Sequence, residues 1–400
     1  MSAATSLRSF VSIAGPALPT MSFLARLPAA ICPIGTLLML TELNGIGRAG
    51  LAAGMLWTGQ ALGGPPIGRM ADRLGHRVVV LSASLANGAA IAAFVAAVLA
   101  DVPAAVEAVL ALLVGLTVPQ IGPLSRTRWI ALTAGKSDLT GRALSADTTI
   151  DEIGFMAGPA LAGLAVTLVH PVAGLLLAGS LIVVFGTLFA VHPTAPGGSR
   201  SRPGTGTTER LLTPPLVVLL VMALLQGMIW GSANAGVSAL AQQLGDPGMA
   251  GFVWGAMAVT SALAGIAVTL RPGKRDLTVR LRIAIAAQAL LLLPLLAVDG
   301  FLGAAAAVAG IGAAVAPHLI AVFGLAERVA PQTRMGEAMS LLGSGLIVGQ
   351  GISALVAGQL AERSGHQTAF TLTCASGLAA VLAAVVLVRT APFAQRVRTA

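Results

Sequence analysis

The sequence has few charged residues and few cysteines, and both shortages narrow the class of protein. Only 10% of its 400 residues are Asp, Glu, Lys or Arg, whereas about a quarter of a soluble domain is charged. Hydrophobic residues make up 56% of the chain, so its solvent is expected to be lipid. Cys32 and Cys374 both fall within long apolar stretches, so neither a disulfide framework nor a cysteine metal cluster is expected.

The common catalytic and nucleotide-binding signatures are also missing from the sequence. There is no G-x-x-x-x-G-K-[ST] phosphate loop, so ATP bound to this chain is not expected to power its work. There is no H-E-x-x-H, G-x-S-x-G or paired C-x-x-C pattern, which leaves an intramembrane enzyme without visible chemistry. The sequence predicts a protein that is not an enzyme and that carries no cofactor or metal.

What the chain does have is a series of long apolar stretches. A helix that crosses a bilayer needs roughly 20 mainly apolar residues, and long unbroken runs exclude a barrel, whose strands alternate over short segments. The sequence therefore predicts an all-α membrane protein with twelve transmembrane helices. The expected spans are 17–41, 49–67, 78–100, 104–125, 143–168, 171–191, 214–240, 248–270, 280–298, 301–325, 335–360 and 366–388.

The basic residues predict the orientation of these helices. The net charge of +9 and the pI near 11.4 would fit a nucleic-acid-binding protein, but the positions of the charges decide otherwise. If the N-terminus is cytoplasmic, every Lys and Arg except Arg26, Arg48 and Arg363 falls in a segment on the inner side. The positive-inside rule thus predicts a multi-pass plasma-membrane protein with both termini in the cytoplasm and no nucleic-acid partner.

The two halves of the chain resemble each other. At an offset of 197, Trp57 aligns with Trp254, and at 195, Gly154 aligns with Gly349. A polar interval rich in Gly, Ser, Thr, Pro and Arg separates the halves and is typical of a flexible linker. We therefore expect two pseudo-symmetric six-helix bundles, 1–192 and 214–400, joined by a cytoplasmic linker over 193–213, an arrangement that fits alternating access around a central site.

The stretch GRMADRLGHR, residues 68–77, concentrates charge between the second and third apolar stretches. It resembles the G-x-x-x-D-R-x-G-R-[RK] loop of the major facilitator superfamily, with His76 in place of a basic residue. The simpler alternative is that its arginines only enforce orientation. The resemblance implies a cytoplasmic gate in which the aspartate faces the start of helix 11 and pairs with Arg126 or Arg128. Its matching residues are Gly68, Asp72, Arg73, Gly75 and Arg77.

A second motif lies in the fifth apolar stretch, GFMAGPALAG, residues 154–163. It resembles the antiporter signature of the same superfamily, G-x-x-x-G-P-x-x-G-G, through Gly154, Gly158, Pro159 and Gly163, while Ala162 replaces the first of the paired glycines. The signature is associated with proton-driven exporters. The alternative is simple close helix packing, which a G-x-x-x-G face also serves.

Ionisable residues inside membrane spans are costly and so are functional candidates. Arg26, Asp147, Asp151 and Glu152 lie within expected spans, and the two aspartates share one helix face. One reading makes Asp151 or Glu152 the proton carrier, with Arg26 promoting release. The other makes Asp147 and Asp151 structural partners of arginines at the inner gate, Arg126, Arg128 or Arg142.

In the superfamily that the chain resembles, helices 1, 4, 7 and 10 line the central cavity. The candidate substrate residues on those helices are Arg26, Gln120, Gln226, Trp230, Asn234 and His318. His318 also titrates near neutrality and is a second proton-coupling candidate, unless it is an ordinary packing histidine.

The resemblance and the membrane carboxylates together predict a monomeric, proton-coupled exporter of a small organic molecule. Two alternatives remain open at this point. One is a proton-coupled importer of a sugar, amino acid or organic anion, and the other is a membrane sensor that transports nothing.

Overall fold

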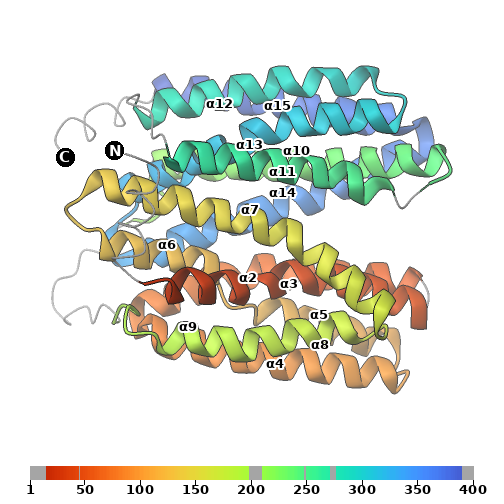
Figure 1. Ribbon diagram of the computed structural model, residues 1–400, viewed down its shortest axis with the longest axis horizontal. Helices are drawn as coiled ribbons and strands as arrows, with labels where there is room; N and C mark the ends of the chain where they lie inside the picture. The colour runs from red at the N-terminus through yellow and green to blue at the C-terminus, as the bar shows by residue number, and fades with distance from the viewer. Residues whose placement is uncertain (1–14, 45, 198–209, 247–248, 271–275, 390–400) are drawn as a thin grey trace. The chain divides into compact units, whose positions relative to one another are not determined.

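The computed structural model describes residues 15–44, 46–197, 210–246, 249–270 and 276–389 (Figure 1), and every structural statement below refers to these residues. Within them, the side chains of residues 46, 47, 137, 138, 152, 156 and 386–389 are not described. Apart from one isolated bridge between Gly75 and Gly197, the regular structure of the described residues is helical. This is the all-α architecture that the apolar stretches predict.

The first half of the chain forms six spans, two of which are interrupted. A proline, Pro119, separates α5 from α6, because its ring and missing N–H break a helix. A short π-helical turn, η1, joins α8 to α9. The elements are α2 (Ala17–Leu43), α3 (Ile46–Leu74), α4 (His76–Leu99), α5 (Ala104–Leu116), α6 (Ile121–Leu132), α7 (Ser137–Leu168), α8 (Ala173–Leu181), η1 (Ile182–Gly186) and α9 (Thr187–Val191).

The second half also forms six spans, and here the tenth helix runs unbroken through its proline, Pro317. The elements are α10 (Pro214–Gln243), α11 (Met249–Leu270), α12 (Leu277–Leu292), the 3-10 turn η2 (Leu293–Ala297), α13 (Phe301–Val329), the 3-10 turn η3 (Gln332–Arg334), α14 (Met335–Ser364) and α15 (His366–Arg389).

Each of the twelve expected spans corresponds to one of these helices or interrupted helices. Eleven are long and apolar enough to cross a membrane by length and composition. The remaining one is the second span, α3. Its 29 residues are long enough, but arginines, Gln60, two adjacent prolines and Asp72 make it less apolar. The chain is thus a multi-pass, all-helical membrane protein.

By its contacts the chain divides into two compact units, and each is described by itself. Unit 1 comprises residues 1–143, 153–208 and 332–344, and unit 2 comprises 144–152, 209–331 and 345–400. The predicted linker, 193–213, lies partly outside the described residues, because 198–209 are not described. Each unit also contains a short segment from the other half of the sequence, namely the first turns of α14 in unit 1 and 144–152 of α7 in unit 2.

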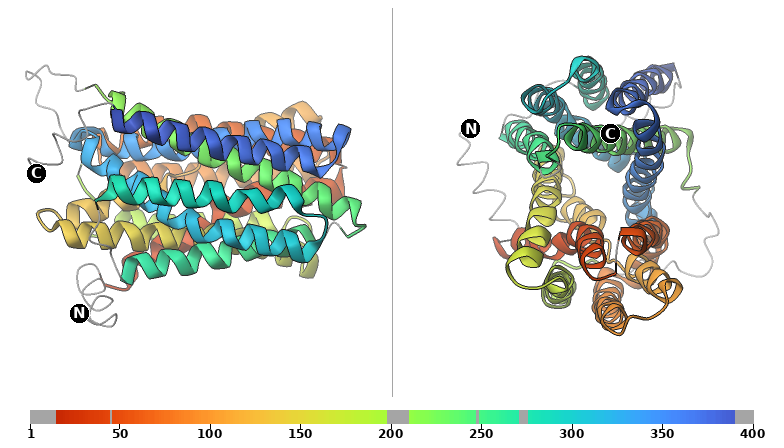
Figure 2. Two further views of the ribbon diagram at one scale, coloured as in Figure 1. Left: turned by 90° about the horizontal axis from the view of Figure 1, so that it is seen from above. Right: turned by 90° about the vertical axis from the view of Figure 1, so that its right-hand side faces the viewer.

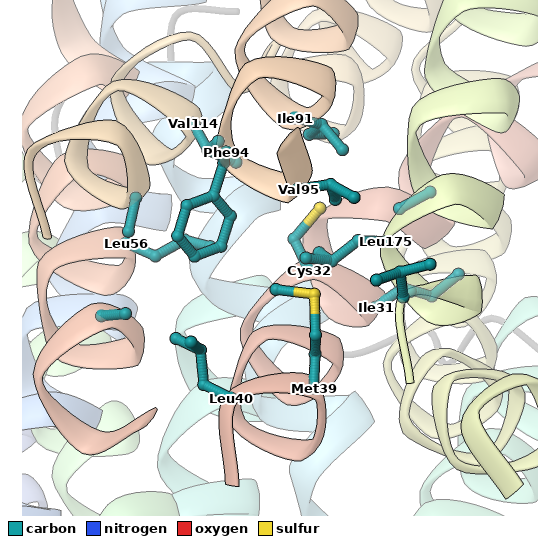
Figure 3. Packing of buried hydrophobic residues seen from close by; sticks show 14 of the residues in the cluster. Ile31, Cys32, Met39, Leu40, Leu56, Ile91, Phe94, Val95, Val114 and Leu175 are labelled. Atoms are coloured by element: carbon teal, nitrogen blue, oxygen red, sulfur yellow. The ribbon is translucent and has the colours of Figure 1, made fainter. Parts of the chain in front are cut away.

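Unit 1 is held together by α3 packed along α5, α2 along α8, and α4 along α5 and α9. Figure 2 shows these helices nearly end-on, with α4 and α5 in orange beside α2 and α3 in red. Gly59 and Gly115 make the first contact possible, because a Cβ at either position would overlap the backbone of the opposite helix. The apolar centre of the unit includes Ile31, Met39 and Phe94 (Figure 3).

In unit 2, the helices that pack together are the repeat equivalents of those that pack together in unit 1. α11 packs along α13 as α3 does along α5, and α10 along α15 as α2 does along α8, while α12 packs on α13 and α15. Gly312 serves the α11 contact, since a Cβ there would overlap the carbonyl oxygen of Met257. The duplication read from the sequence is therefore a duplication of helix packing.

Candidate functional site

Asp72, in the last turn of α3, caps the start of α14. Its Oδ1 accepts a hydrogen bond from the backbone N–H of Gly336 at 2.9 Å, and its Oδ2 accepts one from the N–H of Glu337 at 2.9 Å. These amides belong to the first turn of α14, where a helix has no internal acceptor for its N–H groups. The carboxylate also lies at the positive end of the helix dipole, so its charge is placed favourably.

Burial nevertheless raises the pKa of Asp72 to about 6, because removing the carboxylate from water disfavours its charged form. The two accepted backbone hydrogen bonds oppose this shift, and of the two neighbouring charges that act on it Glu337 raises the pKa while Arg334 lowers it. Arg334 itself holds Glu337 in a two-pronged ion pair, with Nε and Nη2 each 2.8 Å from a carboxylate oxygen. The cap therefore sits inside a small cluster of charges at the end of α14.

Glycines allow α3 and α14 to approach closely beside this cap. A Cβ on Gly68 would lie 2.5 Å from both the carbonyl oxygen of Gly336 and the Oγ of Ser340, and one on Gly64 would lie 2.6 Å from the Oγ of Ser344. Positions 64, 68 and 72 are one helical turn apart, as are 336, 340 and 344, so the two helices meet along matching stripes. We call this contact the α3–α14 ladder.

The rest of the loop motif divides into exposed and buried residues. Arg73 and Arg77 are exposed, as expected of charges at a membrane face. Gly75 has φ +92°, a conformation that favours glycine, and it connects α3 to α4. His76, which replaces the basic residue of the family pattern, is buried with its Nε2 3.3 Å from the Oγ1 of Thr127.

Both arginines of α6 are buried, Arg126 at 3% and Arg128 at 0% exposure. Arg128 does not make the contact with Asp72 that the resemblance implies. Its Nη1 donates to the carbonyl oxygen of Phe189 at 2.7 Å, and its guanidinium carbon lies 3.6 Å from the centre of the Phe189 ring. Because both carboxylate oxygens of Asp72 are directed to α14, the loop and Arg128 serve different contacts in this structure.

The carboxylates of the fifth span lie on the segment of α7 that belongs to unit 2. Asp147 is fully buried and Asp151 is half-buried, while the side chain of Glu152 lies outside the described residues. Between the two aspartates, Thr149 packs against α11 so closely that a Cβ at Gly265 would overlap its Oγ1. This segment is thus fixed tightly within unit 2.

The antiporter-like motif begins where α7 returns to unit 1. Gly158 lies against α2, and a Cβ there would lie only 2.5 Å from the Cβ of Ala30. Around Gly163 the space is open, and at Gly154 the nearest neighbour is the ring of Phe23 at 4.0 Å. Pro159 is exposed, and α7 continues through it. Close packing therefore explains Gly158 but not Gly163.

A buried polar network lies inside unit 2 and centres on His318 of α13. The Nδ1 of His318 is 2.7 Å from the Oε1 of Gln226 on α10 and 3.2 Å from the Oε1 of Gln288 on α12. Two acceptors facing one ring nitrogen indicate that Nδ1 carries a hydrogen. The three side chains are at most 2% exposed, so the network belongs to the interior of this unit.

The other predicted cavity residues are spread over both units. In unit 1, Arg26 is buried on α2, and Gln120 is half-buried at the start of α6, where its Nε2 donates to the carbonyl oxygen of Val118 at 3.2 Å. In unit 2, Trp230 is half-buried and Asn234 is exposed on α10.

Gln288 and Glu107 are polar residues that were not predicted from the sequence. Glu107 is only 1% exposed and lies 3.4 Å from Arg48 in unit 1, and Arg48 also lies 2.8 Å from the exposed Asp101. Both Gln288 and Glu107 are single polar residues inside apolar runs. That isolation was the signal available in the sequence.

Twelve spans in two repeated halves, with a capped and glycine-packed contact between α3 and α14, define a duplicated helical membrane protein of the transporter type. A family model described as Major Facilitator Superfamily matches residues 10–337, and the chain belongs to this superfamily. A comparison with curated protein sequences finds no match.

Solved structures show the same fold at low sequence identity. The Escherichia coli fucose:proton symporter FucP (N162A) is 15% identical, with a TM-score of 0.71 and coverage of 96% of this chain and 99% of that chain. A bacterial homologue of the iron transporter ferroportin, in an outward-facing state, is 16% identical, with a TM-score of 0.71 and coverage of 93% and 99%. The human organic anion transporter MFSD10 (TETRAN) is 18% identical, with a TM-score of 0.65 and coverage of 94% and 97%.

Proposed function

We propose that this chain is a secondary transporter that exports a small organic molecule in exchange for protons by alternating access. The observation that carries the proposal is the position of the carboxylates on α7. Asp147 is buried and Asp151 half-buried on a segment that belongs to unit 2, whereas the rest of α7 belongs to unit 1. A carboxylate that is buried in one state of a transport cycle and hydrated in another changes its proton affinity between them, because burial disfavours its charged form.

The direction of transport rests on the fifth span. Its G-x-x-x-G-P motif is the pattern associated with proton-driven exporters. Because Gly158 has no side chain, α7 can pack closely against α2 at this position. α2 also carries Arg26, which in this mechanism favours release of the proton by stabilising the ionised carboxylate. Arg26 is a buried cation among the proposed cavity residues. Such a charge disfavours strongly cationic substrates, so neutral or anionic solutes are the proposed cargo.

In the same mechanism the α3–α14 ladder is the inner gate. Opening the inner side separates Asp72 from the amides of Gly336 and Glu337, and closing it restores both hydrogen bonds. A contact that is made in one state and lost in the other biases the equilibrium between them.

The proposed setting is the plasma membrane, with the chain acting as a monomer and both termini in the cytoplasm. In this orientation the arginine-rich ends of α3 and α6, and the segment that follows α9, face the cytoplasm, as the positive-inside rule requires. Substrate, protons and the lipid bilayer are then the partners of the protein.

The test is transport in vesicles of known orientation with an imposed pH gradient. In inside-out vesicles with an acid lumen, the protein should accumulate neutral or anionic fluorescent solutes, carboxyfluorescein among them, and a pyranine signal should report proton efflux from the lumen. Accumulation in right-side-out vesicles with an acid exterior would instead establish import.

A matched pair of variants separates transport from sensing. Asp151→Asn and Glu152→Gln should abolish gradient-driven accumulation, whereas the exposed Asp299→Asn should leave it unchanged. Wild-type protein that moves neither solute nor protons across the whole solute panel would count against the transporter proposal and in favour of a sensor.

A further inference from the structure

Arg128 is a buried cation held in place by one helix of unit 1. It is 0% exposed on α6. Phe189 of α9 fixes it twice, by accepting a hydrogen bond from Nη1 at 2.7 Å and by placing its ring 3.6 Å from the guanidinium carbon. Stacking and a backbone hydrogen bond together set the plane of the guanidinium. The side chain is therefore oriented before any ligand arrives.

The opposite edge of this guanidinium has no partner. Nε and Nη2 of Arg128 are buried and have no hydrogen-bond acceptor among the described residues. These two nitrogens point the same way from the planar group and match the spacing of two oxygens on one anion. The same edge of another arginine, Arg334, binds a carboxylate in this structure, because its Nε and Nη2 each lie 2.8 Å from an oxygen of Glu337.

Among the described residues, nitrogen groups lie near Arg128 but no carboxylate is paired with it. His76 contacts the adjacent residue Thr127. Burial, and after it the positive charge of Arg128, lowers the pKa of His192 just beyond α9. Among the described residues, no Asp or Glu forms an ion pair with Arg128. A buried charge without a counter-ion is strongly unfavourable, so an anion bound at this edge would stabilise the folded protein.

We propose that the free edge of Arg128 binds an oxyanion of the phosphate type through two parallel hydrogen bonds. The site lies where α4 begins at His76 and α9 ends at Val191, which is the depth at which apolar helices meet lipid headgroups. Exposed Arg73 and Arg77 lie next to it along the chain, and basic clusters at helix ends attract anionic headgroups. The phosphate is supplied either by an anionic phospholipid or by free inorganic phosphate.

Binding to purified protein tests this without any transport measurement, so its outcome is independent of the proposed export. The protein is delipidated in a phosphate-free maltoside detergent, and its thermal unfolding is followed as inorganic phosphate replaces chloride at constant ionic strength. In parallel it is placed in nanodiscs of phosphatidylglycerol or of phosphatidylcholine. A ligand that binds only the folded state raises the melting temperature saturably.

The expected result is a saturable rise in melting temperature with phosphate, with phosphatidylglycerol relative to phosphatidylcholine, or with both. A response to phosphatidylglycerol alone assigns the site to lipid, and a response to free phosphate alone assigns it to the soluble anion. Arg128→Gln should weaken the effective ligand by about tenfold or more, because hydrogen bonds to charged groups are strong. Arg128→Lys should weaken it as well, because a lysine has no two-pronged edge.

Two comparisons protect the test against a folding defect. The exposed Arg69→Gln removes the same charge from α3 and should leave the response unchanged. If Arg128→Gln does not fold, native mass spectrometry of the wild type should still detect a bound phospholipid or phosphate that survives delipidation. A wild-type protein that retains no such ligand and responds to neither phosphate nor phosphatidylglycerol overturns the proposal, as does an Arg128→Gln variant with the full response.

Discussion

The carboxylate of Asp72 accepts a hydrogen bond from the backbone N–H of Gly336 at 2.9 Å, although the two residues are 264 positions apart. Its second oxygen takes the next amide along, so one side chain at the end of α3 satisfies two N–H groups at the start of α14. A single carboxylate therefore holds together segments from opposite halves of the sequence.

Replacing Asp72 with Asn should weaken this contact without removing substrate binding. Asn keeps one oxygen acceptor but loses the second and the charge, and losing a helix cap costs about 1 kcal/mol. Amide hydrogen exchange of Gly336 and Glu337 should become faster, and transport turnover should fall. The exposed Asp246→Asn is the control. Unchanged exchange and turnover in Asp72→Asn would contradict the role of the ladder as a gate.

The raised pKa of Asp72 predicts a specific pH dependence. Its pKa is about 6 in the structure and 3.8 in water, so the folded state binds the proton more tightly than the unfolded state. The contribution of this group to stability is therefore greatest below pH 3.8 and is lost as the pH rises through 6. The melting temperature of the wild type should show such a component between pH 4 and 7. Asp72→Asn should lack it, and identical pH profiles would contradict the prediction.

Gly68→Ala should destabilise the protein, because the new methyl group would lie 2.5 Å from the Gly336 carbonyl oxygen and the Ser340 Oγ. Overpacking of this kind costs about 1 to 3 kcal/mol. Gly54→Ala on the same helix meets open space and should be neutral or stabilising by up to about 1 kcal/mol, since Ala is the better helix former. Thermal unfolding measures both variants. Equal effects would contradict the close packing of α3 against α14 at Gly68.

Gln288→Ala should destabilise unit 2 by about 1 to 3 kcal/mol, because it removes an acceptor from buried His318. The exposed Gln242→Ala should change the melting temperature little. If His318 also carries a proton during transport, Gln288→Ala should shift the pH profile of transport in addition to stability. A variant that lowers stability but leaves that profile in place assigns the network to packing alone.

Asp151→Asn should separate proton coupling from substrate movement. A neutral amide cannot take up and release the proton, so transport driven by a pH gradient should be lost while exchange of labelled for unlabelled solute continues. The measurement compares the two modes in the same vesicles. Loss of both modes together with a lower melting temperature would make Asp151 a structural residue instead.

The helices followed from the sequence because long apolar runs leave the backbone only one way to satisfy its N–H groups in lipid. The run predicted as 17–41 ends at Leu43, and the run predicted as 366–388 ends at Arg389. The glycines of the loop motif were equally readable, and Gly68 and Gly75 each have a steric reason in the structure.

The partners of individual side chains could not be predicted from the sequence in the same way. Arg128 follows the fourth expected span in the sequence, but its contact with Phe189 joins residues 61 positions apart, and no local pattern specifies that pairing. His318 and Gln226 were both predicted as cavity residues, but the contact between them, and that of His318 with Gln288, could not be predicted from the sequence. Periodicity identifies which residues share a helix, but tertiary packing decides which of them meet.

The exchange of short segments between the two units bears on how the protein is made. Unit 1 contains residues 332–344. When the first six helices have been synthesised, this segment of unit 1 has therefore not yet been made. The α14 end of the ladder is synthesised late, and until then Asp72 has no amides to cap. A chain that ended within the linker would therefore lack the residues of α14 whose amides Asp72 accepts from.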